Sequence, residues 1–270
     1  MPVIVRNEND IHPDPPVLEE IVKRGYVLVK YARTELDPDE NNVVGPAQKA
    51  YPRYDWATLA VWAWGGMRVL DYLQTQDYVD KDKIVITGHS RGGKVALLAG
   101  ALDERFTLVA PNGSGCGGAG CFRVMGEKAE SLELITRPDR FGYWFHPRLR
   151  LFAEQVERLP FDSHFLKALV APRPLLSTEA LDDLWANPLG TQVTYLAAKQ
   201  VYDWLGAPDR IGLHFRPGRH DQTAEDWLAL LDFADQQFYG KTVQRNFKRL
   251  PFPVTKKYFS WKAPAENDDK

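Results

Sequence analysis

The chain has 270 residues, 44% of them hydrophobic and 26% charged, which is enough for one large domain with a sizeable buried core. Its formal net charge of −2 gives no electrostatic reason to expect nucleic acid or an anionic membrane as a partner. No apolar run approaches the length of a membrane span, and the first residues lack the basic and apolar segments of a signal peptide.

Predicted strands and helices alternate along most of the chain. Short β-branched or continuous apolar runs indicate strands, and longer amphipathic segments indicate helices. In chain order we expect a strand at 2–6, a helix at 17–25, a strand at 26–32, a polar loop at 34–54, a helix at 55–74 with Asp55 as its N-cap, a strand at 83–88, a helix at 92–103 and a strand at 106–113. There follow an irregular, aromatic-rich insert at about 120–165, a strand at 172–180, a helix at 190–205, a strand at 211–218 and a helix at 222–239.

This alternation predicts an α/β fold with three layers and a mostly parallel sheet. We expect one domain over residues 1–240, with the insert at about 120–165 as part of it. Residues 241–270 are expected to form a tail that packs on the surface and has a flexible end.

A serine stands in a tight turn between a predicted strand and a predicted helix, in the stretch IVITGHSRGGK. The residues Gly88-His89-Ser90-Arg91-Gly92 match the G-x-S-x-G pattern of a nucleophile elbow. Glycines suit such a turn because the serine is strained and neighbouring backbone approaches without room for a Cβ. The pattern alone is weak, but its position between strand and helix favours a catalytic serine at the N-terminus of a helix.

A catalytic serine needs a base, and in this fold the expected chain order is serine, acid, histidine. Among the histidines, only His220 follows the last predicted strand and precedes the last helix. The others lie in the elbow (His89), in loops or the insert (His12, His146 and His164) or within a strand (His214). The acid should follow the strand at 172–180, where Glu179, Asp182 and Asp183 all remain candidates, although each could instead cap the next helix.

The chain has two cysteines, Cys116 and Cys121, in a glycine-rich loop. Their spacing allows either a small disulfide or two reduced thiols, and the sequence has no four-ligand zinc pattern.

Four stretches together resemble the bacterial branch of carbohydrate esterase family 15, the glucuronoyl esterases: GHSRGGKVALLAGALDERF, NGSGCGGAG, STEALDDLWANP and RPGRHDQT. The resemblance extends over residues 2–240 and implies the α/β-hydrolase fold. Members of this family are usually secreted or periplasmic and have a further N-terminal segment before the point where this chain starts. The resemblance therefore implies that the first antiparallel strands are lacking here and that the strand at 2–6 lies beside the nucleophile strand.

The resemblance implies roles for particular residues. Ser90 would be the nucleophile, His220 the base, and Arg91 would help to stabilise the oxyanion. Fungal members carry a glutamate where this chain has Asn112, so the acid would be Asp183, two residues before a tryptophan. Residues expected to contact the sugar are Lys94, Glu127 and Trp185.

These roles imply a serine esterase that acts through an acyl-enzyme, with no metal or organic cofactor. The implied substrates are 4-O-methyl-glucuronoyl esters that link glucuronoxylan to lignin alcohols. The alternatives are an acetyl-xylan or other carboxylic ester hydrolase, and a non-catalytic carbohydrate-binding relative.

Overall fold

The computed structural model describes residues 1–11, 14–254, 258–262 and 264. The strands are β1 (Val3–Glu8), β2 (Val27–Ala32), β3 (Ile84–His89), β4 (Leu108–Asn112), β5 (Leu175–Ala180) and β6 (Ile211–Arg216). The α-helices are α1 (Leu18–Lys23), α2 (Pro46–Ala50), α3 (Thr58–Gln74), α4 (Arg91–Leu102), α5 (Leu132–Ile135), α6 (His164–Val170), α7 (Pro188–Trp204) and α8 (Ala224–Tyr239). Short 3₁₀ helices lie at Arg33–Glu35, Gly142–Trp144, Pro147–Phe152, Val156–Arg158 and Leu184–Ala186.

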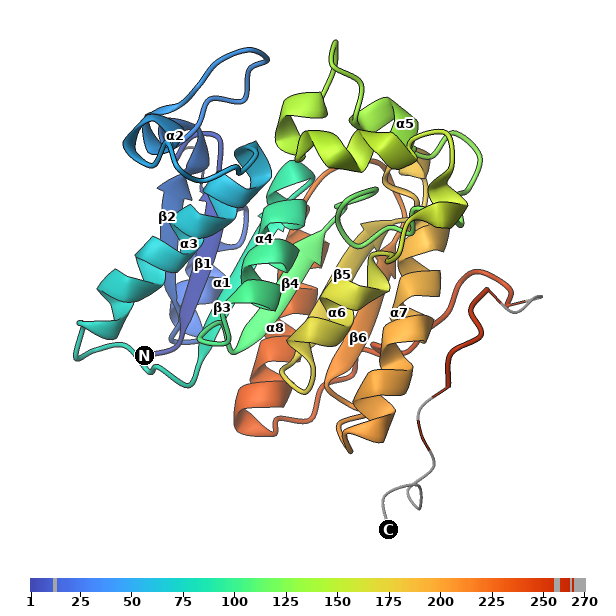
Figure 1. The fold of residues 1–270 in the computed structure, drawn as a ribbon. Coiled ribbons are helices and arrows are strands. Elements are labelled where there is room, and N and C mark those ends of the chain that lie inside the picture. The colour runs from blue at the N-terminus through green and yellow to red at the C-terminus, as the bar shows by residue number, and fades with distance from the viewer. Residues whose placement is uncertain (12–13, 255–257, 263, 265–270) are drawn as a thin grey trace.

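The strands form one six-stranded sheet in the order β2-β1-β3-β4-β5-β6, and every neighbouring pair is parallel. This confirms the predicted α/β fold with a parallel sheet. The predicted placement of the first strand beside the nucleophile strand is also confirmed, since Val3 of β1 pairs with Ile84 of β3. Because all strands run the same way, their carboxyl ends meet at one edge, the upper edge in Figure 1, where the insert around α5 lies.

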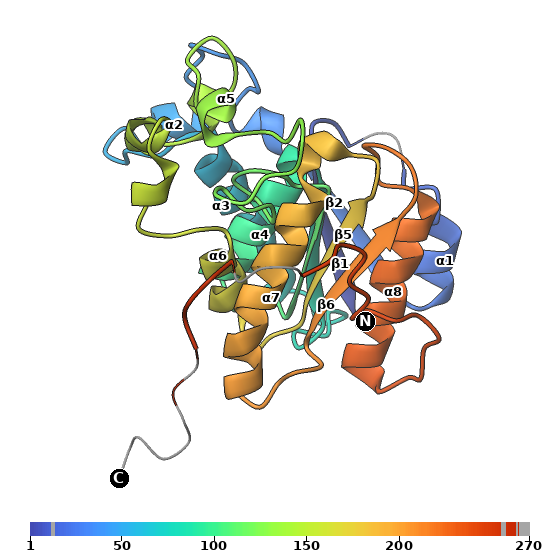
Figure 2. The same ribbon diagram turned by 90° about the vertical axis from the view of Figure 1, so that its right-hand side faces the viewer.

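Helices cover both faces of the sheet, as Figure 2 shows: α3, α4, α6 and α7 on one face, α1 and α8 on the other. Successive strand side chains point to opposite faces. Val3 and Val5 of β1 therefore join the core beneath α3 and α4, whereas Ile4 joins the core beneath α1 and α8 together with Trp227. None of the helices within the described ranges is both long enough and apolar enough to cross a lipid bilayer.

Three local expectations need correction. Asp55 does not cap the helix after it, because α3 starts at Thr58 with Ala57 as its N-cap, and the exposed Asp55 carboxylate pairs with His146 instead. The segment expected to be a loop at 34–54 contains α2, a short helix that begins with a proline at its first turn. The end of the expected insert overlaps α6, which packs against α4 and α7.

The tail contacts the domain at Phe247 and Phe252. Phe247 is buried beside Phe233 of α8, with ring centroids 5.0 Å apart, and its carbonyl accepts a hydrogen bond from Leu213 N of β6 at 2.7 Å. Phe252 exchanges two hydrogen bonds with the Gln192 side chain on α7. These contacts cover the outer edge of β6, while the end at 265–270, expected to be flexible, lies outside the described residues. The domain boundary at residue 240 stays a prediction.

Candidate active site

Ser90 forms the tip of a sharp turn that joins β3 to α4. Its backbone has φ 57° and ψ −122°, a left-handed conformation that is strained for a residue with a Cβ. The turn closes tightly, since a Cβ on Gly88 would lie 2.4 Å from the carbonyl oxygen of Gly92, and a Cβ on Gly92 would lie 2.8 Å from Asn7 Oδ1. Gly88 is therefore required by close backbone approach, and Gly92 leaves room for the buried Asn7 side chain. Helix α4 begins at Arg91; Gly93 N and Lys94 N donate to the carbonyl of the N-cap Ser90, so the N–H groups of Arg91 and Gly92 are the ones without an acceptor within the helix.

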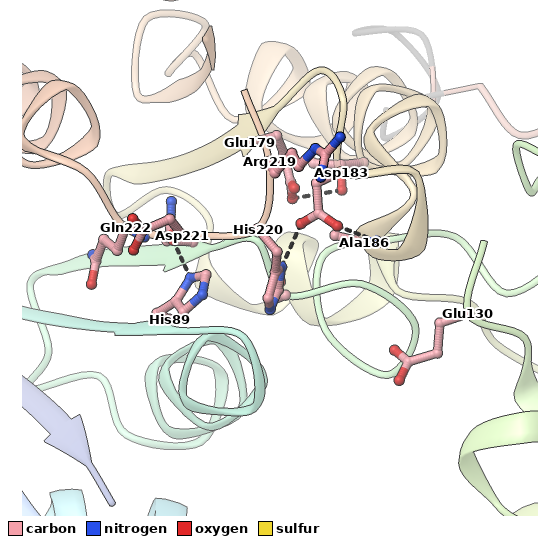
Figure 3. Close-up of polar contacts among 12 residues, drawn as sticks. His89, Glu130, Glu179, Asp183, Ala186, Arg219, His220, Asp221 and Gln222 are labelled. Carbon is pink, nitrogen blue, oxygen red and sulfur yellow. Dashed lines mark hydrogen bonds and ion pairs between the residues drawn. The ribbon is translucent and has the colours of Figure 1, made fainter. Parts of the chain in front are cut away.

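His220 lies in the loop after β6 and contacts Asp183, which follows β5. His220 Nδ1 and Asp183 Oδ2 are 2.5 Å apart, and Figure 3 shows the carboxylate directed at the imidazole. The Asp183 side chain is only 4% exposed and the His220 side chain 38%. The second oxygen of Asp183 accepts a hydrogen bond from Ala186 N, which fixes the orientation of the carboxylate. Asp183 contacts Nδ1 of the ring, so Nε2 is the nitrogen of His220 that does not contact this carboxylate.

The other two acid candidates make different contacts. Asp182 is exposed and accepts a hydrogen bond from Gly218 N at 2.9 Å. Glu179 is fully buried and accepts one from Thr191 Oγ1 at 2.9 Å, and burial raises its pKa to about 8. Of the three candidates left open by the sequence, Asp183 is the one that contacts His220.

A cavity of about 220 Å³ lies in front of the serine. Its walls include five of the residues expected at the site, namely Ser90, Arg91, Lys94, Trp185 and His220. Among the described residues the Ser90 hydroxyl forms no hydrogen bond with His220; such contacts are often long in enzymes without substrate. One face of the cavity is aromatic, because Phe141 stacks on Trp144 at 4.2 Å with an interplanar angle of 13°.

His89, the residue before the serine, packs against His220 with ring centroids 4.4 Å apart. Its Nδ1 lies 2.6 Å from Asn112 Oδ1, and Asn112 Nδ2 donates to Thr178 Oγ1 at 2.7 Å. Burial, helped by the neighbouring His220, lowers the pKa of His89 to about 4, so this ring is neutral at physiological pH. Asn112 thus binds a second histidine next to the candidate base.

Lys94 is buried and its ammonium group is fully hydrogen-bonded. It donates to Ser114 O at 2.8 Å, to Cys116 O at 2.6 Å and to Glu130 Oε2 at 2.8 Å, which uses all three of its N–H donors. The structure therefore brings Glu130 into the cavity, whereas the expected Glu127 is exposed and does not line it. Both glutamates belong to the stretch GEKAE, but only Glu130 is buried and contacts Lys94.

The remaining candidates that the structure describes do not line this cavity. His146 pairs with Asp55, and His214 on β6 lies 3.3 Å from Glu225, whereas His12 is outside the described residues. Cys116 and Cys121 are both buried free thiols, so the disulfide alternative is wrong. Within the described ranges no group of three or more histidine, cysteine, aspartate or glutamate side chains could hold a metal ion.

Known proteins resemble this chain in sequence and in structure. Residues 2–206 match a family model described as the glucuronyl esterases of fungi. Carbohydrate esterase MZ0003, from an unknown prokaryotic organism, is 36% identical over 246 residues, which are 83% of this chain and 56% of that protein. The 4-O-methyl-glucuronoyl methylesterase of Podospora anserina is 36% identical over 160 residues, which are 57% of this chain and 33% of that protein. The chain thus spans between a third and about half of the length of these relatives.

A solved structure agrees with these matches. The carbohydrate esterase family 15 glucuronoyl esterase from Caldicellulosiruptor kristjansonii aligns with a TM-score of 0.89 and 34% sequence identity. The alignment covers 97% of this chain and 74% of that one. By sequence and by fold, this chain belongs to carbohydrate esterase family 15, the glucuronoyl esterases.

Proposed function

We propose that this chain is a serine esterase that hydrolyses 4-O-methyl-glucuronoyl esters joining glucuronoxylan to lignin alcohols. The observation that carries the proposal is the contact between Asp183 and His220 at the cavity that also contains Ser90. Membership of the glucuronoyl esterases supports the substrate class, and relatives named 4-O-methyl-glucuronoyl methylesterase support the sugar.

In this proposal Asp183 accepts the Nδ1 proton of His220, which leaves Nε2 as the base that faces the serine. His220 takes the Ser90 proton while Oγ bonds to the ester carbonyl carbon, and the Asp183 carboxylate stabilises the resulting imidazolium. The Arg91 guanidinium and the first N–H groups of α4 stabilise the tetrahedral oxyanion. Collapse of this intermediate breaks the bond to the alcohol, which takes its proton from His220. Water then repeats the sequence and releases the uronic acid.

Recognition of the sugar falls to other residues that line the same cavity as His220. All three N–H donors of Lys94 are bonded to protein atoms. We therefore assign Lys94 to holding Glu130 in place, and not to binding sugar hydroxyls, which was the role expected from the resemblance. Glu130 Oε1 then remains to accept hydrogen bonds from the sugar. Trp185, 38% exposed at the same cavity, offers a flat apolar face for the sugar ring. Glu127 is the weaker candidate for this role because its side chain is exposed away from the cavity lining.

The proposal is tested with benzyl and methyl esters of glucuronic acid, using the wild-type chain and Ser90→Ala. Ser90→Ala should lose hydrolysis while keeping the melting temperature, because the hydroxyl has no structural hydrogen bond among the described residues. Hydrolysis that survives in Ser90→Ala would remove this serine from the mechanism. Faster hydrolysis of acetylated xylan than of glucuronate esters would reassign the substrate, and failure of Ser90 to react with a fluorophosphonate would favour a non-catalytic carbohydrate-binding protein.

We also propose a secreted or periplasmic location. A polymeric plant cell-wall ester cannot enter a cell, so an enzyme that acts on it has to meet it outside the cytoplasm. Immunoblotting of culture supernatant, periplasmic extract and cell lysate tests this expectation, and recovery from the cytoplasm alone would contradict it.

A further inference from the structure

We propose that Asp39 is a positioning residue that aims the Arg91 guanidinium at the oxyanion, an inference that rests on the esterase function proposed above. The geometry behind it is an ion pair between Arg91 Nη1 and Asp39 Oδ2 at the rim of the cavity. Asp39 is distant in sequence from every other residue of the site, and it follows the short 3₁₀ helix after β2.

The Asp39 carboxylate uses both oxygens to join separate parts of the site. Oδ2 binds Arg91, the first residue of α4, while Oδ1 accepts hydrogen bonds from Tyr143 Oη and Trp144 Nε1, both at 2.8 Å. The side chain is only 12% exposed. Burial alone would raise the pKa of Asp39, but the hydrogen bonds from Trp144, Arg91 and Tyr143 lower it below the ordinary value, so the carboxylate is charged at neutral pH.

Asp39 and two aromatic rings, those of Trp144 and Phe141, hold the guanidinium in place. Its central carbon lies 4.7 Å from the Trp144 ring centroid, a cation–π contact, and Nη1 is held by Asp39. Within the described part of the chain the guanidinium makes no other hydrogen bond, so Nε and Nη2 remain as donors. A long arginine side chain, one-third exposed, would otherwise sample many rotamers, and oxyanion donors act only when they are held in advance.

The segment that carries Asp39 is itself fixed to the fold. Asp37, two residues earlier, is fully buried and accepts hydrogen bonds from Gly45 N and Gln48 Nε2, both at 2.8 Å. Its carbonyl accepts another from Trp62 Nε1 of α3 at 2.7 Å. The backbone that carries Asp39 is therefore held in place by these hydrogen bonds, as a positioning residue requires.

The informative substitution is Asp39→Asn. Trp144 Nε1 can only donate, so the asparagine oxygen has to stay with it, and the amide nitrogen then faces the Arg91 donor without bonding to it. We expect kcat for a methyl glucuronate ester to fall roughly 10- to 100-fold with KM changed less than about threefold, because the oxyanion donor is misplaced while the sugar site is intact. The second-order rate of labelling by a fluorophosphonate should fall with kcat, since its phosphoryl oxygen occupies the same position.

A double-mutant cycle separates positioning from general destabilisation. In the Arg91→Ala background, Asp39→Asn should change kcat by less than about twofold, because the group that it positions is gone. The matched control is Asp235→Asn on α8, a carboxylate that also binds an arginine, Arg24, and a tyrosine hydroxyl, Tyr26, but on the opposite face of the sheet. This control should lower the melting temperature and leave kcat unchanged.

Equal losses of kcat from Asp39→Asn in the presence and absence of Arg91 would overturn the proposal, as would an unchanged kcat with Arg91 present. If Asp39→Asn does not fold, Asp39→Glu keeps the charge and displaces it by one methylene, so an unchanged kcat in that variant would also overturn it. If the wild type reacts with the fluorophosphonate but cleaves no glucuronate ester, the substrate assignment fails, and the labelling rates of the variants still decide the role of Asp39.

Discussion

Replacing Lys94 by methionine tests how the sugar-binding wall of the cavity is held together. Lys94 and Glu130 are each only 4% exposed, and their charged groups lie 2.8 Å apart. Methionine keeps most of the side-chain volume but leaves a buried carboxylate without its counter-charge. Removing one partner of a buried pair costs about 3–5 kcal/mol, because the remaining charge is neither solvated nor compensated. For a domain of this size we expect the melting temperature to fall by about 6 to 20 °C.

The double variant Lys94→Met with Glu130→Gln provides the matched control. It removes both charges, so it should be more stable than Lys94→Met alone even though it carries one substitution more. Chemical denaturation at pH 7 measures both free energies of unfolding. A loss below about 1 kcal/mol for Lys94→Met, or a double variant that is the less stable of the two, would contradict a buried, charge-compensated pair.

Three further predictions follow from the contacts of individual side chains. Asp183→Asn should lower kcat by roughly 10²- to 10⁴-fold, because His220 loses the acceptor for its Nδ1 proton. Asp182→Asn should lower kcat by less than about threefold, because this carboxylate contacts Gly218 N instead. The reverse order in steady-state kinetics would reassign the acid. Glu179→Gln should become more stable relative to the wild type as the pH rises from 5 to 8. The raised pKa of about 8 keeps the Glu179 carboxyl neutral in the folded state while it ionises in the unfolded chain, so the free energy of unfolding of the wild type falls by up to about 1.4 kcal/mol per pH unit. The same pH dependence of unfolding in both proteins would refute this. Burial raises the pKa of Cys121 to about 12 and that of Cys116 well above its ordinary value, so a thiol reagent should modify both only after unfolding, and fast reaction of the native chain would contradict their burial.

The parts of the fold and site that the sequence predicts are those with a local signature. The strand, the glycines and the helix that surround Ser90 lie within a few residues of one another, so the turn is visible as a motif. His220 could be selected because a parallel sheet brings the loops after its strands to one edge, which makes chain order informative. The choice of Asp183 among three acids needed the family resemblance, since all three lie in the same short segment.

The parts that the sequence did not predict depend on contacts between distant segments. Glu130 rather than Glu127 contacts Lys94 because of the path of the irregular insert. This insert has no hydrophobic periodicity, so its sequence does not predict which side chains point towards the cavity. Asp39 reaches Trp144 across 105 residues, and nothing in the polar loop that contains it distinguishes this carboxylate from its neighbours. The exposed Asp55 looked like a helix cap, but capping requires a backbone geometry that begins only at Ala57.

Our proposal places the acid after β5, at Asp183, and the surroundings of Asn112 at the end of β4 give a physical reason for this. Asn112 Nδ2 donates to Thr178, approaching both its hydroxyl at 2.7 Å and its backbone carbonyl at 3.4 Å. A carboxylate oxygen in that place would face the carbonyl oxygen, which it cannot bond and which would repel it. Burial lowers the pKa of His89 to about 4 and keeps it neutral, and the uncharged Asn112 amide supplies no counter-charge that would favour its protonation. Asp183 contacts only one of the two adjacent imidazoles, and this contact distinguishes His220 from His89 as the proposed base.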